Sequence, residues 1–388
     1  KVLCVLADEP HAAPSGSNVI YKAAGLHEED ITLTGGQTLY LAPGAVVKGK
    51  MKVTGTNVKI CGTGMLYDPN ETNGDGRYML GVGPSYNTQI QDIKIVGRSR
   101  GNYNITLSGA DNSVIDNVRI LSCMISDDGI SVFSGSDNLK IKNCFIYNID
   151  DALVMGGSSR NYPSKTEITG CLIGTTCSVF AQAYIGIVNA VDNTAFEMAS
   201  GTDKKHGLMK CLMEPPRESW VGRLTIKNFD ASHANITAKM MWIQGSGSKY
   251  KKNIKLINVR MREPDATLWG SPHYDFYMRS SSEIPESSGY NIEINGLYFD
   301  DVEVTDAKMY SRALVPQKNT LLYGWNESTN KISFLPSAEK TGVLLAPEDL
   351  TAEMSGRNLQ LEWTEKNIDA DGYNIYKNGE LIGTSILN

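Results

Sequence analysis

The sequence predicts an all-β protein whose main part is a right-handed, single-stranded parallel β-helix, with a partial β-sandwich at the C-terminal end. Two features of the 388 residues lead to this expectation. Short apolar runs alternate with period two, and they restart at intervals of about 20–35 residues. Helical periodicity is almost absent. Apolar residues make up 41% of the chain, which is enough to build a core and excludes a disordered protein.

The repeated unit consists of a polar turn, a short alternating strand and a corner of Gly, Asn or Ser. Leucine-rich repeats and propellers have a similar interval, but the leucine pattern with one helix per repeat and a recurring Trp-Asp pair are both missing. A parallel coil remains, in which each turn buries its apolar face against the next turn. The recurring segments are 57–62, 92–97, 117–123, 138–144, 165–171, 223–228, 253–258 and 291–295.

Three of the seven cysteines occupy equivalent places in successive repeats. These are Cys123, Cys144 and Cys171, and the sequence has no Cys-x-x-Cys pair for zinc or redox chemistry. We therefore expect an inward ladder of small apolar thiols rather than disulfides or metal ligands.

The segments on either side of the coil are expected to be separate. Residues 1–30 are interpreted as the end of a preceding β domain and a linker, because prolines and glycine punctuate them. The β-helix is expected to span 31–336, followed by a linker over 337–345. Residues 346–388 resemble the first half of a fibronectin type III module, with Trp363 in a core strand and a hairpin turn at Asn378-Gly379. We expect the natural polypeptide to continue beyond both ends.

Charge and composition exclude several classes of function. The formal net charge is −6, and no dense Lys/Arg run is present, which disfavours a nucleic-acid partner. No stretch is apolar enough to predict a membrane span. The five histidines show no ligand spacing, so we expect neither a metal nor another cofactor. The oligomeric state cannot be predicted from these features.

Two adjacent repeats carry paired carboxylates at matching corners. The pairs are Asp127-Asp128 and Asp150-Asp151, and Asp128 precedes Asp151 by 23 residues, which is one coil. Adjacent coils lie ~4.8 Å apart. Like charges at that distance raise one another's pKa, so one carboxyl group can stay protonated while others are ionised, as acid/base cleavage of a glycosidic bond requires.

A structural interpretation competes with this chemistry. Asp-Gly and Asp-Asp are ordinary turn formers, so either pair alone is more typical of a turn than of a catalytic site. Adjacent strand residues also face opposite ways, so Asp150 and Asp151 reach one cleft only if the corner between them is irregular.

The run Asp128-Gly-Ile, followed one coil later by Asp150-Asp151-Ala-Leu, resembles the catalytic segment of the polygalacturonases and of the related dextranases and isopullulanases. Segments 17–21, 25–27, 36–49 and 62–68 resemble the β-helix entry of the dextranase-type members. The resemblance covers about residues 17–185 and implies a pectin-lyase-like fold and an inverting glycoside hydrolase acting on an α-linkage. It also implies Asp150 as the general acid, with Asp128 and Asp151 holding the attacking water. Asp127 is a secondary catalytic candidate.

The sequence departs from the polygalacturonase pattern at two places. Where that pattern has Gly-His-Gly on the following coil, this chain has Thr176-Cys177-Ser178. The later Arg-x-Lys of the pattern has no counterpart, because Arg223 and Lys227 have the wrong spacing. These departures disfavour a galacturonate substrate and favour the dextranase type.

Further residues are candidates for binding a polysaccharide or oligosaccharide, since sugar sites present aromatic faces and amide groups. For any single one of them, a packing role is the competing interpretation. The candidates are Gln182, Tyr184, Trp242, Gln244, Trp269 and His273.

Three functions remain open from the sequence. A glycoside hydrolase is favoured by the stacked carboxylates. A polysaccharide lyase on the same architecture would use clustered aspartates to bind Ca²⁺ and a Lys or Arg as base, but no basic residue flanks the acidic corner. A non-catalytic carbohydrate-binding β-helix is the third. Each suits a secreted, cell-surface or periplasmic protein, and four Asn-x-Ser/Thr triplets are compatible with export.

Overall fold

The computed structural model describes twenty segments of the chain. They are residues 12–68, 78–97, 103–123, 127–133, 135–155, 164–182, 186–198, 207–213, 221–236, 239–245, 251–262, 276–280, 289–300, 302–304, 322–323, 331–334, 348–355, 358–364, 372–377 and 380–386. Contacts divide the chain into two compact units, Lys1–Leu335 and Pro336–Asn388. Within the described residues we find no helix with the length and apolar character that a membrane span requires.

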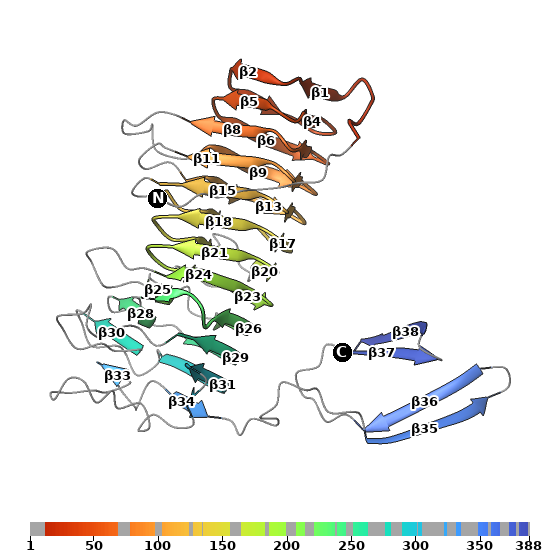
Figure 1. Cartoon of the computed structure of the whole chain (residues 1–388), viewed down its shortest axis with the longest axis vertical. Helices are drawn as coiled ribbons and strands as arrows, with labels where there is room; N and C mark the ends of the chain where they lie inside the picture. Colours follow the sequence, from red (N-terminus) through yellow and green to blue (C-terminus); the bar gives the residue numbers. More distant parts are fainter. Residues whose placement is uncertain are drawn as a thin grey trace. The chain divides into compact units, whose positions relative to one another are not determined.

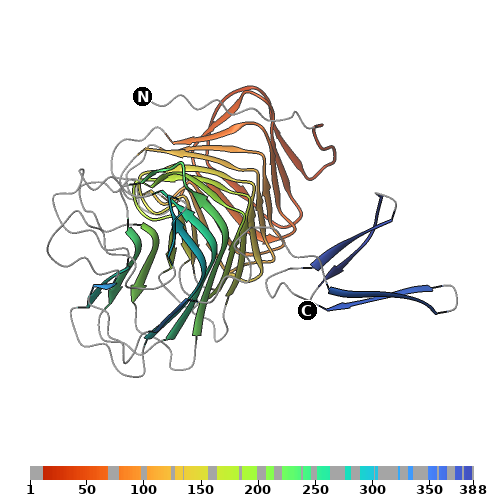
Figure 2. The same cartoon turned by 60° about the horizontal axis from the view of Figure 1, so that its bottom comes forward.

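The first unit is a right-handed parallel β-helix, which confirms the predicted fold class (Figures 1 and 2). Its strands form a 22-stranded sheet and a 12-stranded sheet that wind around one core. The larger sheet contains two columns of parallel strands, and the smaller one contains the third. Each coil therefore contributes up to three short strands joined by corners, and strand i of one coil pairs with its counterpart in the next coil.

The strand bounds follow this order. The first column contains β1 (Val19–Lys22), β4 (Thr38–Leu41), β7 (Lys59–Gly62), β10 (Gln89–Gln91), β14 (Val114–Asp116), β17 (Leu139–Lys142), β20 (Ser164–Thr169), β23 (Gly186–Val191), β26 (Val221–Ala231), β29 (Lys251–Met261), β31 (Gly289–Phe299) and β34 (Lys331–Phe334). The second contains β2 (Gly25–Glu28), β5 (Ala45–Lys48), β8 (Met65–Asp68), β11 (Lys94–Gly97), β15 (Arg119–Ser122), β18 (Phe145–Asn148), β21 (Leu172–Thr175), β24 (Thr194–Met198) and β27 (Asn235–Ile236).

The third column forms the 12-stranded sheet. It contains β3 (Ile31–Leu33), β6 (Met51–Thr56), β9 (Leu80–Tyr86), β12 (Ile105–Ser108), β16 (Ile130–Phe133), β19 (Leu153–Met155), β22 (Phe180–Gln182), β25 (Gly207–Met213), β28 (Lys239–Gly245), β30 (Phe276–Ser280) and β33 (Leu322–Tyr323). Two short strands lie beside these columns, β13 (Ala110–Asp111) and β32 (Val302–Glu303).

Apolar side chains stack inside the coil because the register places like residues over one another. Ile90 pairs with Ile115 and Ile95 with Ile120, and all of these are almost completely buried. Burying one such side chain contributes about 1.5–3 kcal/mol. The alternation seen in the sequence is thus the alternation between this continuous core and the outer surface.

The coil begins earlier than the sequence suggested. Strands β1 and β2 pair in parallel with β4 and β5, so residues 19–28 belong to the β-helix and not to a linker. The prolines misled the prediction because they precede this coil and do not interrupt it. Residues 1–11, expected to end a preceding domain, lie outside the described residues.

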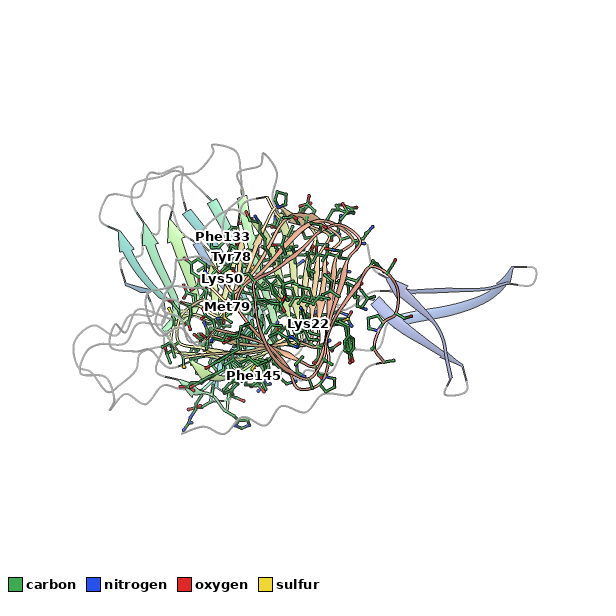
Figure 3. All side chains as sticks on the ribbon, turned by 90° about the horizontal axis from the view of Figure 1, so that it is seen from above. Lys22, Lys50, Tyr78, Met79, Phe133 and Phe145 are labelled. Carbon is green, nitrogen blue, oxygen red and sulfur yellow. The ribbon has the colours of Figure 1, made fainter. Side chains whose placement is uncertain are left out.

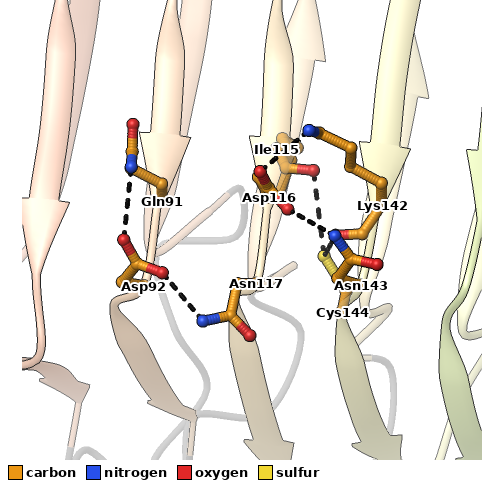
Figure 4. Close-up of polar contacts among 8 residues, drawn as sticks. All are labelled: Gln91, Asp92, Ile115, Asp116, Asn117, Lys142, Asn143 and Cys144. Carbon is orange, nitrogen blue, oxygen red and sulfur yellow. Dashed lines mark hydrogen bonds and ion pairs between the residues drawn. The ribbon is translucent and has the colours of Figure 1, made fainter. Parts of the chain in front are cut away.

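Polar corners between the first two columns are stabilised by left-handed residues that are mostly Asn. Asp92, Asn117 and Asn143 have φ values of 66°, 54° and 55°, a conformation that Asn and Asp tolerate better than most side chains do. The Asn117 amide donates to Asp92 Oδ1 at 2.8 Å, and the Asn143 amide donates to Asp116 Oδ1 at 2.9 Å (Figure 4). Each corner is therefore tied to the corner of the neighbouring coil.

Replacing Asn117 separates the contribution of its side-chain hydrogen bond from that of its tolerance for a positive φ. We expect Asn117→Ala to lower the free energy of unfolding by about 1–2 kcal/mol, because alanine loses the hydrogen bond and strains the positive φ. Asn117→Gly loses the hydrogen bond without the strain and should cost less, although the greater entropy that glycine loses on folding offsets part of this advantage. Urea unfolding of both variants measures the difference. Equal losses would mean that backbone strain at this corner is no larger than that entropy cost.

The predicted thiol ladder forms in part. Cys144 and Cys171 are both buried in the core, and a hydrogen bond to Cys171, followed by burial, raises the pKa of Cys144. Cys123 is exposed, so its inclusion in the ladder was wrong. Cys123 directly follows Ser122, the last residue of β15, and the chain has already left the strand pattern there.

The C-terminal unit contains two antiparallel hairpins. Strand β35 (Glu348–Ser355) pairs with β36 (Asn358–Thr364), and β37 (Gly372–Lys377) pairs with β38 (Glu380–Ile386). The predicted hairpin is present, while the turn residues Asn378 and Gly379 lie outside the described residues. The fibronectin type III resemblance and the linker over 337–345 stay predictions.

Candidate active site

Backbone hydrogen bonds place the two acidic pairs in register. Gly129 N donates to Asp151 O at 2.9 Å, and Ile130 pairs with Leu153. Asp128 therefore lies over Asp151, at the corner where the chain enters β16 in one coil and β19 in the next. Asp127, Asp128 and Asp151 are buried, and Asp150 is half-buried.

Close packing between coils requires glycine at position 129, the second residue of the Asp-Gly motif. A Cβ atom on Gly129 would lie 2.3 Å from the backbone oxygen of Ala152 in the next coil. Only glycine lets the two acidic corners approach this closely. The motif that sequence reasoning could attribute to an ordinary turn is thus a close contact between coils.

Asp128 points toward the outer face of the third column. Its Oδ2 accepts a hydrogen bond from Ser131 Oγ at 3.1 Å, and Ser131 faces outward because its neighbours Ile130 and Val132 lie in the core. The buried amide of Asn104, one coil earlier, donates to the backbone oxygen of Asp128 at 2.9 Å. Ser131 thus fixes the carboxylate of Asp128, and Asn104 fixes its backbone oxygen.

The Asp150-Asp151 corner is irregular, as the sequence interpretation required. The buried Asn148 amide nitrogen lies within 2.9 Å of the backbone oxygens of both Asp150 and Asp151, and 3.2 Å from that of Asp127. Asp151 N donates to Asp150 Oδ1 at 2.9 Å, and Thr175 Oγ1 donates to Asp150 O. These bonds fold the backbone so that adjacent carboxylates reach the same region.

Cys177 from the following coil completes this group. Its thiol donates to Asp151 Oδ1 at 2.9 Å, and Ser178 N donates to the same oxygen at 3.1 Å. One donor atom each from Asp150, Asp151 and Cys177 lies within 4.8 Å of the others. A thiol from a third coil therefore adjoins the two carboxylates.

The chemistry of this group does not suit Ca²⁺. Calcium takes six to eight oxygen ligands, whereas the group offers two carboxylates and a thiol, a soft donor. One of the Asp151 oxygens already accepts two hydrogen bonds. The expectation that no metal is bound stays a prediction.

Tyr103 belongs to the site although the sequence did not single it out. It precedes β12 and occupies the register position of Asp128 one coil earlier, since Asn104 N donates to Asp128 O at 2.9 Å. Burial, followed by the negative charges of Asp128, Asp150 and Asp151, raises the pKa of Tyr103. The negative charges of all three predicted catalytic carboxylates therefore act on the phenol group of Tyr103.

The predicted sugar-binding residues are described only in part. Gln182 ends β22 and pairs with Cys211, while Trp242 and Gln244 lie in β28 and pair with Lys210 and Leu212. Their side chains are outside the described set. Tyr184, Trp269 and His273 lie outside the described residues altogether.

Sequence reasoning missed Asn104, Asn148, Tyr103 and the contact of Cys177. Asn148 had a detectable signal, because asparagine side chains commonly hydrogen-bond to nearby backbone groups at turns and corners. Tyr103 had none, since it stands 25 residues before Asp128 and its proximity depends on the exact register of two coils.

Comparisons with known proteins identify no family. No protein-family model matches the chain, and a search of curated proteins finds no match. Two solved structures are similar at low identity. A family 28 exopolygalacturonase from Yersinia enterocolitica has 11% identity and a TM-score of 0.40, covering 73% of this chain and 69% of its own. The pre-mature gene product 12 of bacteriophage phi29 has 14% identity and a TM-score of 0.36, covering 72% of this chain and 48% of its own.

Proposed function

We propose that this protein is a glycoside hydrolase that cleaves an α-linkage in a polysaccharide at the corner formed by Asp128, Asp150 and Asp151. One observation carries the proposal: two acidic corners from adjacent coils lie in register, and an irregular backbone brings Asp150 beside Asp151. An ordinary turn does not need a buried amide on its backbone oxygens, nor a thiol and a backbone N–H on one oxygen of its carboxylate, as Asp151 has. The resemblance of both motifs to the polygalacturonase and dextranase clan supports the same role.

The residues divide the chemistry according to their exposure and contacts. Asp150 is half-buried and is the general acid, which gives its proton to the glycosidic oxygen as the bond to the anomeric carbon breaks. A water oxygen forms the new bond to that carbon and loses a proton to a carboxylate of Asp128 or Asp151. Cys177 and Ser178 fix one oxygen of Asp151 and orient the other. Asp127 is buried and is a secondary candidate.

The stereochemical outcome has two candidates. The family resemblance supports inversion. The short separation of the Asp150 and Asp151 oxygens, within 4.8 Å, instead favours retention, because inverting enzymes usually keep their carboxyl groups ~6.5–9.5 Å apart and retaining enzymes ~5 Å. With retention, Asp151 would be the nucleophile that bonds to the anomeric carbon before water displaces it. With inversion, water attacks directly on the face of the sugar away from Asp150, and Asp128 is the better placed of the two carboxylates to take its proton, because Asp151 lies beside Asp150.

A substrate screen tests the function. We expect new reducing ends from at least one of dextran, pullulan, mixed α-glucans, pectin and sulfated galactans, without chelator sensitivity. Proton NMR at early times then shows whether the first product is the β anomer (inversion) or the α anomer (retention). Products that absorb in the ultraviolet as unsaturated sugars would indicate a lyase, and binding without turnover would indicate a carbohydrate-binding protein.

The contact of Cys177 with Asp151 gives a separate expectation. Cys177→Ala removes a donor to the carboxylate and should lower kcat about tenfold, with little change in KM, because a hydrogen bond to a charged group is worth about 1.5–3 kcal/mol. Cys177→Ser keeps a donor at the same place and should retain most activity. Steady-state kinetics on the cleaved glycan measures both. Equal rates for the two variants would show that the thiol only fills space.

A further inference from the structure

Half-buried aromatic side chains continue the acidic column toward the N-terminal coils. Backbone hydrogen bonds place Tyr78, Tyr103 and Asp128 at one register position in three successive coils, because Met79 N donates to Tyr103 O and Asn104 N donates to Asp128 O. The ring of Tyr103 lies 5.7 Å from that of Phe133, at an interplanar angle of 50°. We name Tyr78, Tyr103 and Phe133 the aromatic platform.

The platform lies on the outer face of the 12-stranded sheet. Gly81 faces outward between the core residues Leu80 and Val82, and a Cβ atom there would lie 2.7–2.8 Å from the ring of Tyr78. The ring of Tyr78 therefore rests on the sheet. Figure 3, which looks down on the coil from above, labels Tyr78 and Phe133 on the same side of it, away from Phe145.

Small side chains lie beneath and beside these rings. The outward positions of β12 and β16 are Thr106 and Ser131, and Ser131 donates directly to Asp128. Thr106 and Ser131 are buried, so the accessible part of this region consists of the partly exposed aromatic side chains beside the carboxylates. Aromatic faces beside hydrogen-bonding groups suit a sugar ring, which has an apolar C–H face and hydroxyl groups at its edge. The three aromatic residues are partly exposed and are not part of the hydrophobic core.

We propose that the aromatic platform is a sugar-binding subsite directly beside the acidic corner, on its N-terminal side, and that a pyranose ring of the substrate stacks on Tyr103 and Phe133. The proposal rests on the glycoside hydrolase function proposed above and deepens it. It places substrate contacts on the coil of Asp128, through Phe133, and on the coil before it, through Tyr103, whereas Trp242 and Gln244 lie on later coils.

Binding by an inactive protein tests the subsite. In an Asp150→Asn background, electrophoresis through gels that contain dextran, pullulan or polygalacturonate measures affinity without cleavage. We expect at least one glycan to retard the protein, and Tyr103→Ala or Phe133→Leu to weaken that retardation about tenfold, the size of a lost stacking contact. Tyr103→Phe keeps the ring and should keep most of the affinity.

A matched control uses the second aromatic cluster of the coil. Phe196 stacks between Phe145 and Tyr147 on the larger sheet, with centroid distances of 5.6 and 5.9 Å. Tyr147→Ala should leave the retardation unchanged. Absence of retardation by all three glycans, or unchanged retardation after Tyr103→Ala, would overturn the proposal.

A footprinting measurement covers the case in which a variant fails to fold. Hydroxyl-radical labelling of the Asp150→Asn protein, read by mass spectrometry, should show Tyr103 and Phe133 protected by the retarding glycan and Tyr21 unprotected. Equal labelling with and without glycan would overturn the subsite. If the parent protein cleaves a glycan and its binding does not depend on Tyr103, the proposed subsite is wrong but the proposed hydrolase function stands. If binding depends on Tyr103 but no glycan is cleaved, the proposed hydrolase function is wrong but the subsite stands.

Discussion

Asp150→Asn is expected to lower the rate of reducing-end release by about 10²–10⁴-fold, because an amide cannot deliver a proton to the departing glycosidic oxygen. The substitution should leave the corner intact. Asp150 Oδ1 accepts a hydrogen bond from Asp151 N at 2.9 Å, and an asparagine oxygen can accept the same bond. The loss should therefore be chemical and not structural, and the melting temperature should stay close to that of the parent protein.

The leaving group of the substrate distinguishes the role of Asp150 from that of its neighbours. An aryl glycoside with a good leaving group needs little protonation, so Asp150→Asn should lose much less activity on it than on the natural glycan. Asp151→Asn should lose activity on both, since water activation is needed in each case. The reverse pattern would exchange the two roles.

A carboxylate outside the site provides the control. Asp192 is exposed, has a φ of 55° and accepts a hydrogen bond from Asn228 at 2.9 Å, all of which asparagine tolerates. Asp192→Asn should retain full activity. If Asp150→Asn matched this control on every cleaved glycan, Asp150 could not be the general acid.

Asn148→Ala is expected to lower the free energy of unfolding by about 2–4 kcal/mol. The Asn148 amide is completely buried and lies within hydrogen-bond distance of the backbone oxygens of Asp127, Asp150 and Asp151. Alanine removes this donor from all three oxygens, and a typical intramolecular hydrogen bond contributes about 0.5–1.5 kcal/mol. Asp150 O keeps the hydrogen bond from Thr175 Oγ1, and Asp151 O keeps that from Gly129 N, so the expected loss comes from the removed hydrogen bonds and not from orphaned oxygens. Urea unfolding monitored by circular dichroism measures the change.

The exposed Asn18 offers a comparison of the same chemical type. Its amide donates once, to Gly36 O at 2.6 Å, so Asn18→Ala should cost no more than about 1 kcal/mol. We also expect Asn148→Ala to lose activity at temperatures where it is still folded, because its amide shapes the corner that carries both carboxylates. A variant as stable as Asn18→Ala would show that the corner holds its shape without this amide.

The fold was predictable because parallel stacking makes each coil repeat the same alternation. Ile90 over Ile115 and Ile95 over Ile120 are visible in the sequence as recurring apolar positions. The alignment of Asp128 with Asp151 followed from their 23-residue interval for the same reason. Contacts that depend on the backbone path of a corner were not predictable. The hydrogen bond from the Cys177 thiol to Asp151 Oδ1 is an example.

Errors in the prediction arose where local signals competed with the stack. The N-terminal prolines suggested a linker, yet Val19 already pairs with Thr38 in the first coil. Cys123 matched the spacing of Cys144 but is exposed, because spacing alone does not determine on which side of a corner a residue falls. Tyr103 gave no signal, since an aromatic residue before a strand is common.

The linear stacking of coils has a consequence for the durability of the site. Each coil contacts only its neighbours, so local opening starts at the ends of the stack, where one neighbour is missing. Strands β16 and β19, which follow the two acidic corners, have paired strands on both sides. Among the described residues, strand β1 pairs only with β4. Amide hydrogens at the acidic corner should therefore exchange more slowly than those of β1.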